Sequence, residues 1–160
     1  MATSRTGMPS EAHGVDRARL IPIDCKVDDR GFLYQVFGAF GDFGDYPPIK
    51  RVYVVGNHSK GIIRGLHKHT KEYKFFFIVS GSAKFVVESG EGSGVDTFVL
   101  STKQPAVLVV PPGHFHGWTS LADDTAIIGM SNLSLAESEQ DDVRKDPLVL
   151  GRETWETKPR

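Results

Sequence analysis

The sequence predicts an all-β fold, an antiparallel sandwich or barrel, and three observations carry that prediction. Short runs rich in β-branched and aromatic residues recur roughly every 8 to 12 residues, a spacing typical of such folds. Clusters of Gly, Pro, Asn, Asp and Ser separate these runs and predict turns. No apolar repeat of helical spacing intervenes before residue 134. A chain of 160 residues, 39% of them hydrophobic, can bury one core, so we expect a single domain.

The first five expected strands are apolar or alternating runs, and each ends at or near turn residues. In order they are 20–23 (LIPI), 32–37 (FLYQVF), 49–55 (IKRVYVV), 62–69 (IIRGLHKH) and 75–79 (FFFIV). The turn-rich separators among them are 41–48 and 57–61. The three phenylalanines of 75–77 are apolar on both faces of a strand, which predicts burial on both sides.

The second five strands follow the same pattern and lead into a polar segment. They are 83–88 (AKFVVE), 97–100 (TFVL), 106–110 (AVLVV), 115–120 (FHGWTS) and 126–133 (AIIGMSNL), with turns at 80–82, 90–94 and 111–113. Residues 134–145 are mostly acidic and polar, and Leu135 and Val143 are their larger apolar residues. We expect a short C-terminal helical or irregular segment there.

Composition and charge indicate the domain organisation, the kinds of partner and the cellular location to expect. Residues 1–18 are predicted to form a flexible N-terminal tail, and 19–160 a single domain. A net charge of −1 without a basic patch argues against nucleic acid, and no run of about 18 apolar residues suggests a membrane span. Cys25 is the single cysteine, so no internal disulfide forms and a cytoplasmic location is expected. We predict that Cys25 is buried as a small hydrophobe.

Four of the six histidines fall in two short windows, 64–69 (RGLHKH) and 111–116 (PPGHFH). His67 and His69 are two apart on an expected strand, so their side chains leave the same face. His116 follows a Pro-Pro-Gly turn, whereas His114 lies within the turn itself. This arrangement predicts a site in the mouth of a small barrel.

The two windows resemble the motifs of the cupin family: Gly, His-x-His, Glu and Gly, then Pro-x-Gly-x-x-His. The resemblance implies a cupin fold, that is, a double-stranded β-helix or jelly-roll barrel. Lys74 stands where a cupin places its metal-binding glutamate. Because an ammonium cannot coordinate a cation and repels one, we expect no metal and no other cofactor. A metal-dependent oxygenase using His67, His69 and His116 remains an alternative.

Histidines beside a fixed cation instead suit removal of a proton next to a carbonyl group. An imidazole of ordinary pKa, about 6.5, accepts the proton, and the cation stabilises the enolate oxygen. Trp118, directly after His116-Gly117, is placed to stack on a sugar or a base.

Residues 61–67, 74 and 111–117, with Asp29-Arg30-Gly31-Phe32, make the chain similar to the dTDP-4-dehydrorhamnose 3,5-epimerase family over 20–155. The resemblance implies an isomerase of deoxysugar biosynthesis that epimerises a dTDP-linked 4-keto-6-deoxy sugar at C3, or at C3 and C5. It implies His67 as the base and His116 in the pocket wall. It further implies that Lys74 and Arg64 stabilise the enolate or hold substrate, and that Arg30 binds the diphosphate. Gln35 stands where the family contacts the nucleotide with an acidic residue, so we assign it to substrate binding.

The chain also resembles the sugar-nucleotide 3,4-ketoisomerases, through His69 and through residues 50–53, which include Tyr53. We therefore count Tyr53 and His69, with His67 and Lys74, as candidate catalytic residues. The epimerases place a tyrosine in the strand that matches 126–131, where this chain has Met130. Ketoisomerases need no acid on the opposite face, so ketoisomerase remains an alternative. A further alternative is a sugar-nucleotide binding module without turnover.

Assembly is the last expectation drawn from the sequence. Short edge strands and an apolar N-terminal segment favour pairing of two chains, and both resembling families imply the same. We expect a homodimer.

Overall fold

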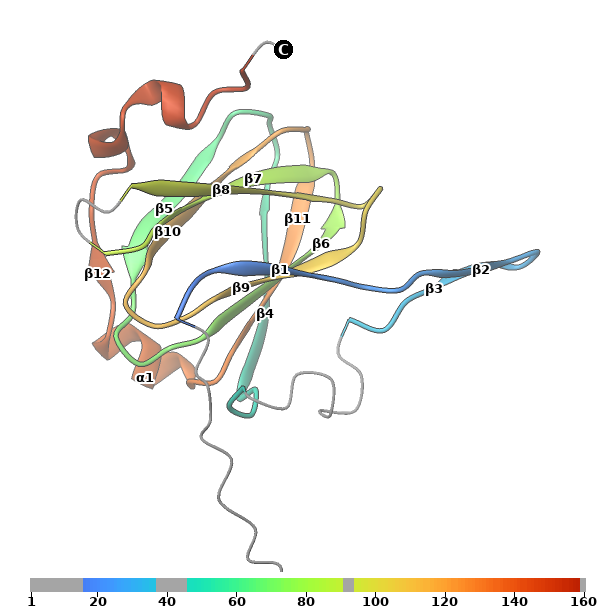
Figure 1. The fold of residues 1–160 in the computed structure, drawn as a ribbon, viewed down its shortest axis with the longest axis horizontal. Helices are drawn as coiled ribbons and strands as arrows, with labels where there is room; N and C mark the ends of the chain where they lie inside the picture. Colours follow the sequence, from blue (N-terminus) through green and yellow to red (C-terminus); the bar gives the residue numbers. More distant parts are fainter. Residues whose placement is uncertain (1–15, 37–45, 91–93, 159–160) are drawn as a thin grey trace, which may run out of the picture.

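Two antiparallel five-stranded sheets face each other and enclose the core (Figure 1). The computed structural model describes residues 16–36, 46–90 and 94–158. One sheet has the order β1-β9-β6-β11-β4 and the other β12-β5-β10-β7-β8, while β2 and β3 form a separate hairpin. The strands are β1 Arg19–Pro22, β2 Lys26–Asp28, β3 Gly31–Leu33, β4 Arg51–Asn57, β5 Ile63–Lys68, β6 Lys74–Ser80, β7 Ser82–Glu88, β8 Val95–Ser101, β9 Ala106–Val110, β10 Phe115–Ser120, β11 Thr125–Ser131 and β12 Val143–Arg144. The all-β prediction is confirmed.

Strand β6 shows how the alternation of side chains builds two apolar layers. Phe76 points between the sheets, where it packs in the same core cluster as Phe85 and Trp118. Phe75 and Phe77 point to the other face and join a second cluster beneath partly buried residues of the N-terminal segment. The prediction that 75–77 is buried on both sides is confirmed. Each fully buried phenylalanine contributes about 1.5–3 kcal/mol to the free energy of unfolding.

The pairing of β5 with β10 brings the two histidine windows together. His116 is the cross-strand partner of His67, and Trp118 is the partner of Arg64. The two strands approach closely at Gly65 and Gly117, since a Cβ on Gly117 would lie 2.7 Å from the carbonyl oxygen of Arg64. Only glycine fits at this crossing, so the backbone itself fixes where the histidines lie.

The C-terminal segment crosses the outer edge of the β5 sheet. Helix α1 (Leu135–Gln140) begins with a capping box between Ser134 and Glu137, within the predicted helical region. Strand β12 was not predicted; it pairs with β5 and places Arg144 beside His67. Two 3₁₀ turns, Pro147–Leu150 and Arg152–Thr154, follow. No helix in the described ranges has the length and apolarity needed to cross a membrane.

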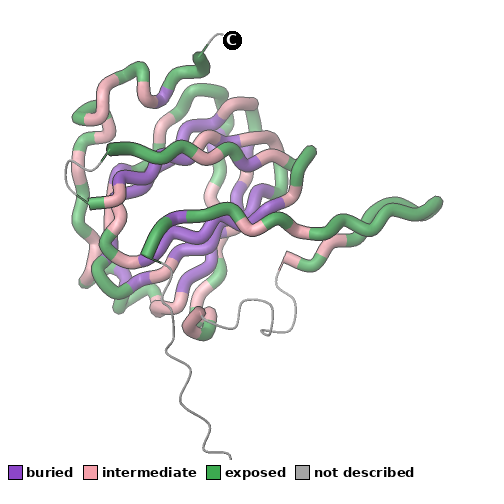
Figure 2. Tube along the Cα trace, in the orientation of Figure 1, coloured by how far each residue is buried: buried purple, intermediate pink, exposed green. Residues whose placement is uncertain are grey.

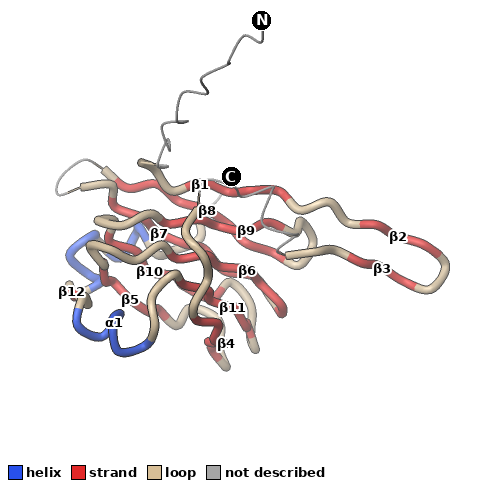
Figure 3. Tube along the Cα trace, turned by 90° about the horizontal axis from the view of Figure 1, so that it is seen from below, coloured by secondary structure: helices blue, strands red, loops and turns tan. Residues whose placement is uncertain are grey.

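Hairpin β2–β3 projects away from the sandwich (Figures 1 and 3) and is exposed along its whole length (Figure 2). The predicted strand 32–37 ends at Leu33, and residue 37 lies outside the described residues, as does 1–15 of the predicted tail. The burial predicted for Cys25 is wrong: this residue precedes the hairpin and is exposed. Its position outside the sandwich, where no second layer covers it, is the physical reason.

Candidate active site

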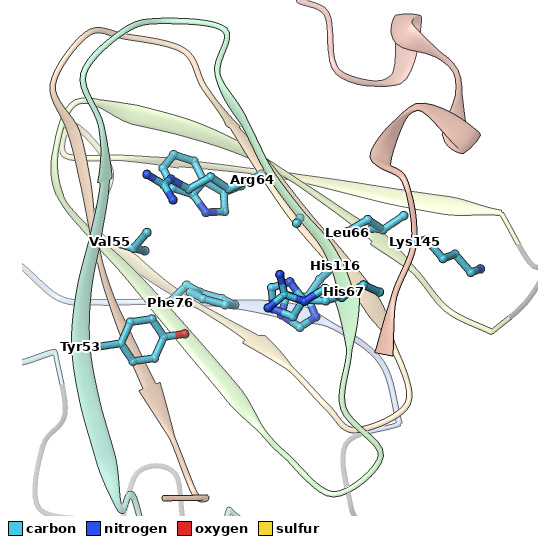
Figure 4. Close-up of a pocket in the computed structure, with 12 residues that line it drawn as sticks. Tyr53, Val55, Arg64, Leu66, His67, Phe76, His116 and Lys145 are labelled. Atoms are coloured by element: carbon cyan, nitrogen blue, oxygen red, sulfur yellow. The ribbon is translucent and has the colours of Figure 1, made fainter. Parts of the chain in front are cut away.

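A cavity of about 260 Å³ opens between the two sheets, and the histidine cluster forms one of its walls (Figure 4). Strands β5 and β10 supply that wall, whereas β4 and β6 supply the wall across from it. The lining residues are Tyr53, Val55, Arg64, Gly65, Leu66, His67, Phe76, His116, Gly117, Trp118, Arg144 and Lys145. Five of the nine predicted site residues therefore line one cavity: Tyr53, Arg64, His67, His116 and Trp118.

The three imidazoles contact one another closely. The ring centres of His67 and His116 lie 4.5 Å apart, and those of His67 and His69 lie 5.4 Å apart. His69 lies just beyond the end of β5, so the predicted strand 62–69 is one residue shorter than expected at that end. Nδ1 of His116 lies 3.1 Å from the carbonyl oxygen of His114 and donates to it, which leaves Nε2 unprotonated. That Nε2 is buried and has no hydrogen-bond partner among the described residues.

Burial keeps these imidazoles neutral near pH 7. Burial chiefly, then the charges of His69 and Lys74, lowers the pKa of His67 to about 4. Burial likewise lowers the pKa of His69, against the opposing charge of Glu72. The pKa of His116 lies well below its usual value because the ring is fully enclosed. His67 is thus an unprotonated base with a face open to the cavity.

Acid should destabilise the fold through these same rings. An unfolded histidine binds a proton near pH 6.5, whereas folded His67 resists it until about pH 4, so the unfolded state gains protons first as the pH falls. We expect the free energy of unfolding to fall between pH 6.5 and 4, by up to about 1.4 kcal/mol per pKa unit for each ring. Urea unfolding at pH 7, 6 and 5 measures this. His116→Gln should reduce the dependence of the unfolding free energy on pH, whereas His58→Asn, at an exposed histidine, should leave it unchanged. The same pH dependence in the wild type and both variants would contradict the account.

Tyr53 faces the histidines from the opposite wall. Its hydroxyl points across the cavity toward His67 and His116 (Figure 4). Burial first, then the charge of Glu72, raises the pKa of Tyr53 to about 12, so the phenol stays protonated and can donate. The ring lies over Gly129 of β11, its cross-strand neighbour, and a Cβ there would lie 2.6 Å from the Tyr53 hydroxyl oxygen. Strand β11 has no tyrosine of its own, and Tyr53 from the neighbouring strand β4 occupies the space beside it.

Gly129→Ala is expected to disturb this arrangement. The added methyl group overlaps the end of the Tyr53 ring and must displace its hydroxyl. We expect kcat to fall by about 10–100-fold, because a misplacement near 1 Å costs up to about that much. Steady-state kinetics measures the effect, and the same substitution in a Tyr53→Phe background is the control. If Gly129→Ala lowers kcat equally with and without the hydroxyl, the effect does not pass through Tyr53.

Arg64 and Trp118 sit side by side in the cavity, as cross-strand partners. The Arg64 guanidinium is held by β4, donating from Nε to Asn57 (2.6 Å) and from Nη2 to the carbonyl oxygen of Gly56 (2.9 Å). Trp118 is buried and stacks on Phe85 at 6.2 Å between ring centres. It therefore serves the core and the cavity at once.

Lys74 does not line the cavity. Its ammonium group lies 2.8 Å from Oε1 of Glu72, a fully buried carboxylate that the sequence analysis did not single out. The two residues are two apart, and this opposite-charge pair directly before the apolar run 75–79 was the available signal. Lys74 still acts on the histidines through its charge, which lowers the pKa of His67.

Two further cations at the cavity rim, Arg144 and Lys145, were also missed. Arg144 belongs to β12, and Lys145 is the residue after it. Both reach the cavity because β12 pairs with β5, and no local sequence pattern predicts that pairing. Arg144 is paired with Asp142 at 2.7 Å, and Lys145 with Glu88 at 3.0 Å.

The structure does not bring Arg30 or Gln35 into this cavity. Arg30 lies at the turn of hairpin β2–β3, where it is exposed and pairs with Asp28, and Gln35 is exposed beyond β3. Within the part of the chain that the structure describes, no group of three or more His, Cys, Asp and Glu side chains has the geometry of a metal site.

Comparison with known proteins supports the architecture. A structure of the rmlC epimerase of Mycobacterium tuberculosis superposes with a TM-score of 0.73 at 22% identity, over 92% of this chain and 74% of that one. A 3,4-ketoisomerase from Helicobacter canadensis superposes with a TM-score of 0.69 at 18% identity, over 86% and 96%. ChmJ, a 3'-monoepimerase from Streptomyces bikiniensis solved with dTDP-quinovose, gives a TM-score of 0.74 at 20% identity, over 84% and 73%. These structures share the fold of this chain.

Sequence comparison places the chain in a family. Among curated proteins, no sequence matches it. The family described as FdtA: WxcM-like, C-terminal matches residues 19–145, which span both sheets, the histidine cluster and β12. The chain therefore belongs to the FdtA family of WxcM-like C-terminal domains.

Proposed function

We propose that the protein is an isomerase that removes the C3 proton of a dTDP-linked 4-keto-6-deoxy sugar, without a metal or other cofactor. One observation carries this proposal: a neutral imidazole, His67, faces a protonated phenol, Tyr53, across a cavity of about 260 Å³. A base and a hydrogen-bond donor on opposite walls suit proton transfer beside a ketone. The structural relatives include epimerases and ketoisomerases of such sugars.

The chemistry follows from that geometry. The imidazole of His67 takes the proton from C3, and the electron pair of the C–H bond moves to form the enolate, with negative charge on the C4 oxygen. The Tyr53 hydroxyl donates a hydrogen bond to that oxygen or returns a proton to C3 from the opposite face. Return from the opposite face inverts C3 and leaves His67 protonated and Tyr53 as a phenolate. Exchange with solvent restores both groups, and a second cycle at C5 then gives double epimerisation.

A 3,4-ketoisomerase is the second candidate. Here the proton taken from C3 is delivered to C4 on the same face. The C3 hydroxyl gives up its proton and becomes the ketone, while the C4 oxygen takes up a proton and becomes a hydroxyl. His67, His69 and His116 all lie on one wall, which suits transfer on a single face. Relatives described as 3,4-ketoisomerases are also matched over 90–96% of their own length.

Cations at the rim suit the diphosphate of the nucleotide. Arg64 is held in place by Asn57 and by the carbonyl oxygen of Gly56, and its exposed guanidinium presents a planar fork to phosphate oxygens. Arg144 and Lys145 add charge at the same opening. Trp118, in the wall, supplies an aromatic edge for the sugar or base.

Hairpin β2–β3 supports the homodimer expected from the sequence. The cytoplasmic location stays a proposal that rests on the single cysteine. The hairpin's apolar side chains have little to bury them within the chain: Val27 is 76% exposed and Phe32 is 70% exposed. Seating the hairpin on a second copy would bury them and carry Arg30 toward the partner's cavity, with Gln35 following. Sedimentation of the purified chain as a dimer, and of Phe32→Asp as a monomer, is the expected result; a monomeric wild type would contradict it.

Incubation with dTDP-4-keto-6-deoxyglucose, followed by NMR of the sugar, tests the activity. An inverted C3 with a retained 4-ketone identifies an epimerase, and a 3-ketone identifies a ketoisomerase. Binding of the sugar nucleotide without any change in it would contradict catalysis and leave a binding module. Turnover that follows stoichiometric metal content would instead support a metal-dependent cupin.

A further inference from the structure

Glu72 is buried beside His69, with 0% of its side chain exposed. A carboxylate so enclosed is costly unless ion pairs and hydrogen bonds satisfy it. Oε1 lies 2.8 Å from Nζ of Lys74 and 2.8 Å from Nη2 of Arg51. The hydroxyl of Ser131 donates to Oε1, and that of Ser138 donates to Oε2 at 2.7 Å. Both oxygens are therefore fully engaged.

These partners come from three neighbouring strands of one sheet, in which Ser131 is the cross-strand partner of both Arg51 and Lys74, and from helix α1. Arg51 begins β4, Lys74 begins β6, Ser131 ends β11, and Ser138 belongs to helix α1. Oε2 also lies 3.1 Å from Nδ1 of His69, which precedes Glu72 by three residues. One carboxylate thus connects three strands of one sheet with the C-terminal helix and with His69, which follows β5 of the other sheet.

The two cations held by Glu72 lie against Tyr53. Nζ of Lys74 lies 5.6 Å from the centre of the Tyr53 ring, and the Arg51 guanidinium carbon lies 5.3 Å from it. Both distances fall within the range of cation–π contact. The position of the Tyr53 hydroxyl therefore depends on where Glu72 holds these cations.

We propose that Glu72 is the positioning residue of this site: its carboxylate keeps Lys74 charged and holds Lys74 and Arg51 against Tyr53. This role deepens the proposed function and rests on it. Glu72 does not line the cavity, so the proposed role is exerted through Lys74 and Arg51.

The balance of charges explains why a carboxylate is needed here. The groups that face Glu72 and Lys74 are Arg51, His69, Tyr53 and, more distantly, Asp142. Burial lowers the pKa of Lys74, and the ion pair with Glu72 opposes that effect. Burial would raise the pKa of Glu72, but its bonds to Lys74, Ser131 and Ser138 outweigh burial and lower it. Without the carboxylate, two buried cations would face each other and Lys74 would lose its proton more readily.

Glu72→Gln tests the inference, because glutamine keeps the shape and removes the charge. The readout is the titration of the Lys74 ammonium group, measured by NMR in protein labelled with ¹³C-lysine. The ¹³Cε resonance of Lys74 is assigned as the one that is missing from the spectrum of Lys74→Met. We expect this titration to move down by about one pH unit or more in Glu72→Gln. We also expect kcat to fall by about 10–100-fold with little change in KM, and the alkaline limb of the kcat profile to move down with Lys74.

Ser138→Ala is the matched control, since it removes one hydrogen bond to Glu72 and no charge. It should lower the melting temperature and leave the Lys74 titration within about 0.3 pH unit of wild type. Glu72→Gln should add little to the loss of kcat in Lys74→Met. An unchanged Lys74 titration in folded Glu72→Gln would overturn the inference. If the wild type converts no sugar nucleotide, the proposed function fails, and the Lys74 titration still decides whether Glu72 holds that charge.

Discussion

His67→Asn is expected to lower kcat on a 4-keto-6-deoxy sugar nucleotide by about 10²–10⁴-fold, the usual contribution of a general base. His67 lines the cavity, and its pKa of about 4 leaves it unprotonated at neutral pH. Asparagine fills a similar space and cannot accept the proton. The loss should appear in kcat, whereas KM should change by less than about threefold, because the base acts in the transition state. Steady-state kinetics at pH 7 measures both.

The same substitution at an exposed histidine supplies the control for that experiment. His58 has a fully exposed side chain and lies outside the cavity, so His58→Asn should retain wild-type kcat. Activity of His67→Asn within about tenfold of wild type would refute the assignment of the base. Equal losses in both variants would point to damaged folding instead.

Tyr53→Phe is expected to lower kcat by about 10²–10³-fold, the effect of removing one donor aimed at developing negative charge. The phenol is protonated at any working pH because its pKa is about 12, and its hydroxyl points at the histidine wall. Phenylalanine keeps the ring over Gly129 and its packing against Arg51, so the fold should be unaffected. Kinetics with the sugar nucleotide, beside thermal unfolding, measures the two effects separately.

Tyr73→Phe is the matched control, because Tyr73 packs against Tyr46 and Phe75 outside the cavity. It should retain wild-type kcat. If Tyr53→Phe abolishes epimerisation at C3 but leaves exchange of the C3 proton with solvent, Tyr53 is the opposite-face acid. Wild-type turnover in Tyr53→Phe would show that the hydroxyl takes no part.

Most of the fold could be predicted because its signals are local. Alternating apolar runs and glycine-rich turns mark β4 to β11, and a Ser-x-x-Glu capping box marks the start of α1. Strand β12 could not be predicted, since two residues carry no period and the strand exists only through pairing with β5. Strand β2 was missed for a similar reason, although its partner β3 overlaps the predicted strand 32–37. The hairpin is exposed on both faces, so burial imposes no pattern on the side chains of β2.

The candidate site could be predicted only in part. His67, His69 and His116 follow from spacing and strand parity, and the cross-strand register brings them together as expected. The place of Tyr53 depends on the register between β4 and β11 and on the absence of a side chain at Gly129. No single window of sequence contains that information.

The surroundings of Lys74 and its pairing with Glu72 could not be predicted from the cupin motif. The cupin pattern drew attention to the lysine in the glutamate's position and to its charge, yet the ammonium group pairs with Glu72 and does not line the cavity. The role of Arg30 could not be predicted from its motif alone. Its hairpin projects from the sandwich (Figure 3), so its proposed role in binding depends on the proposed second copy of the chain.

Exchange of the C3 proton with solvent tests the central claim most directly. Wild-type protein is incubated with dTDP-4-keto-6-deoxyglucose in D₂O, and ¹H NMR follows the C3 signal against a sample containing His67→Asn. We predict loss of the C3 proton signal with the wild type, at a rate at least about 100-fold above that with His67→Asn. Retention of the C3 proton with wild-type protein, or equal exchange with the variant, would contradict the account.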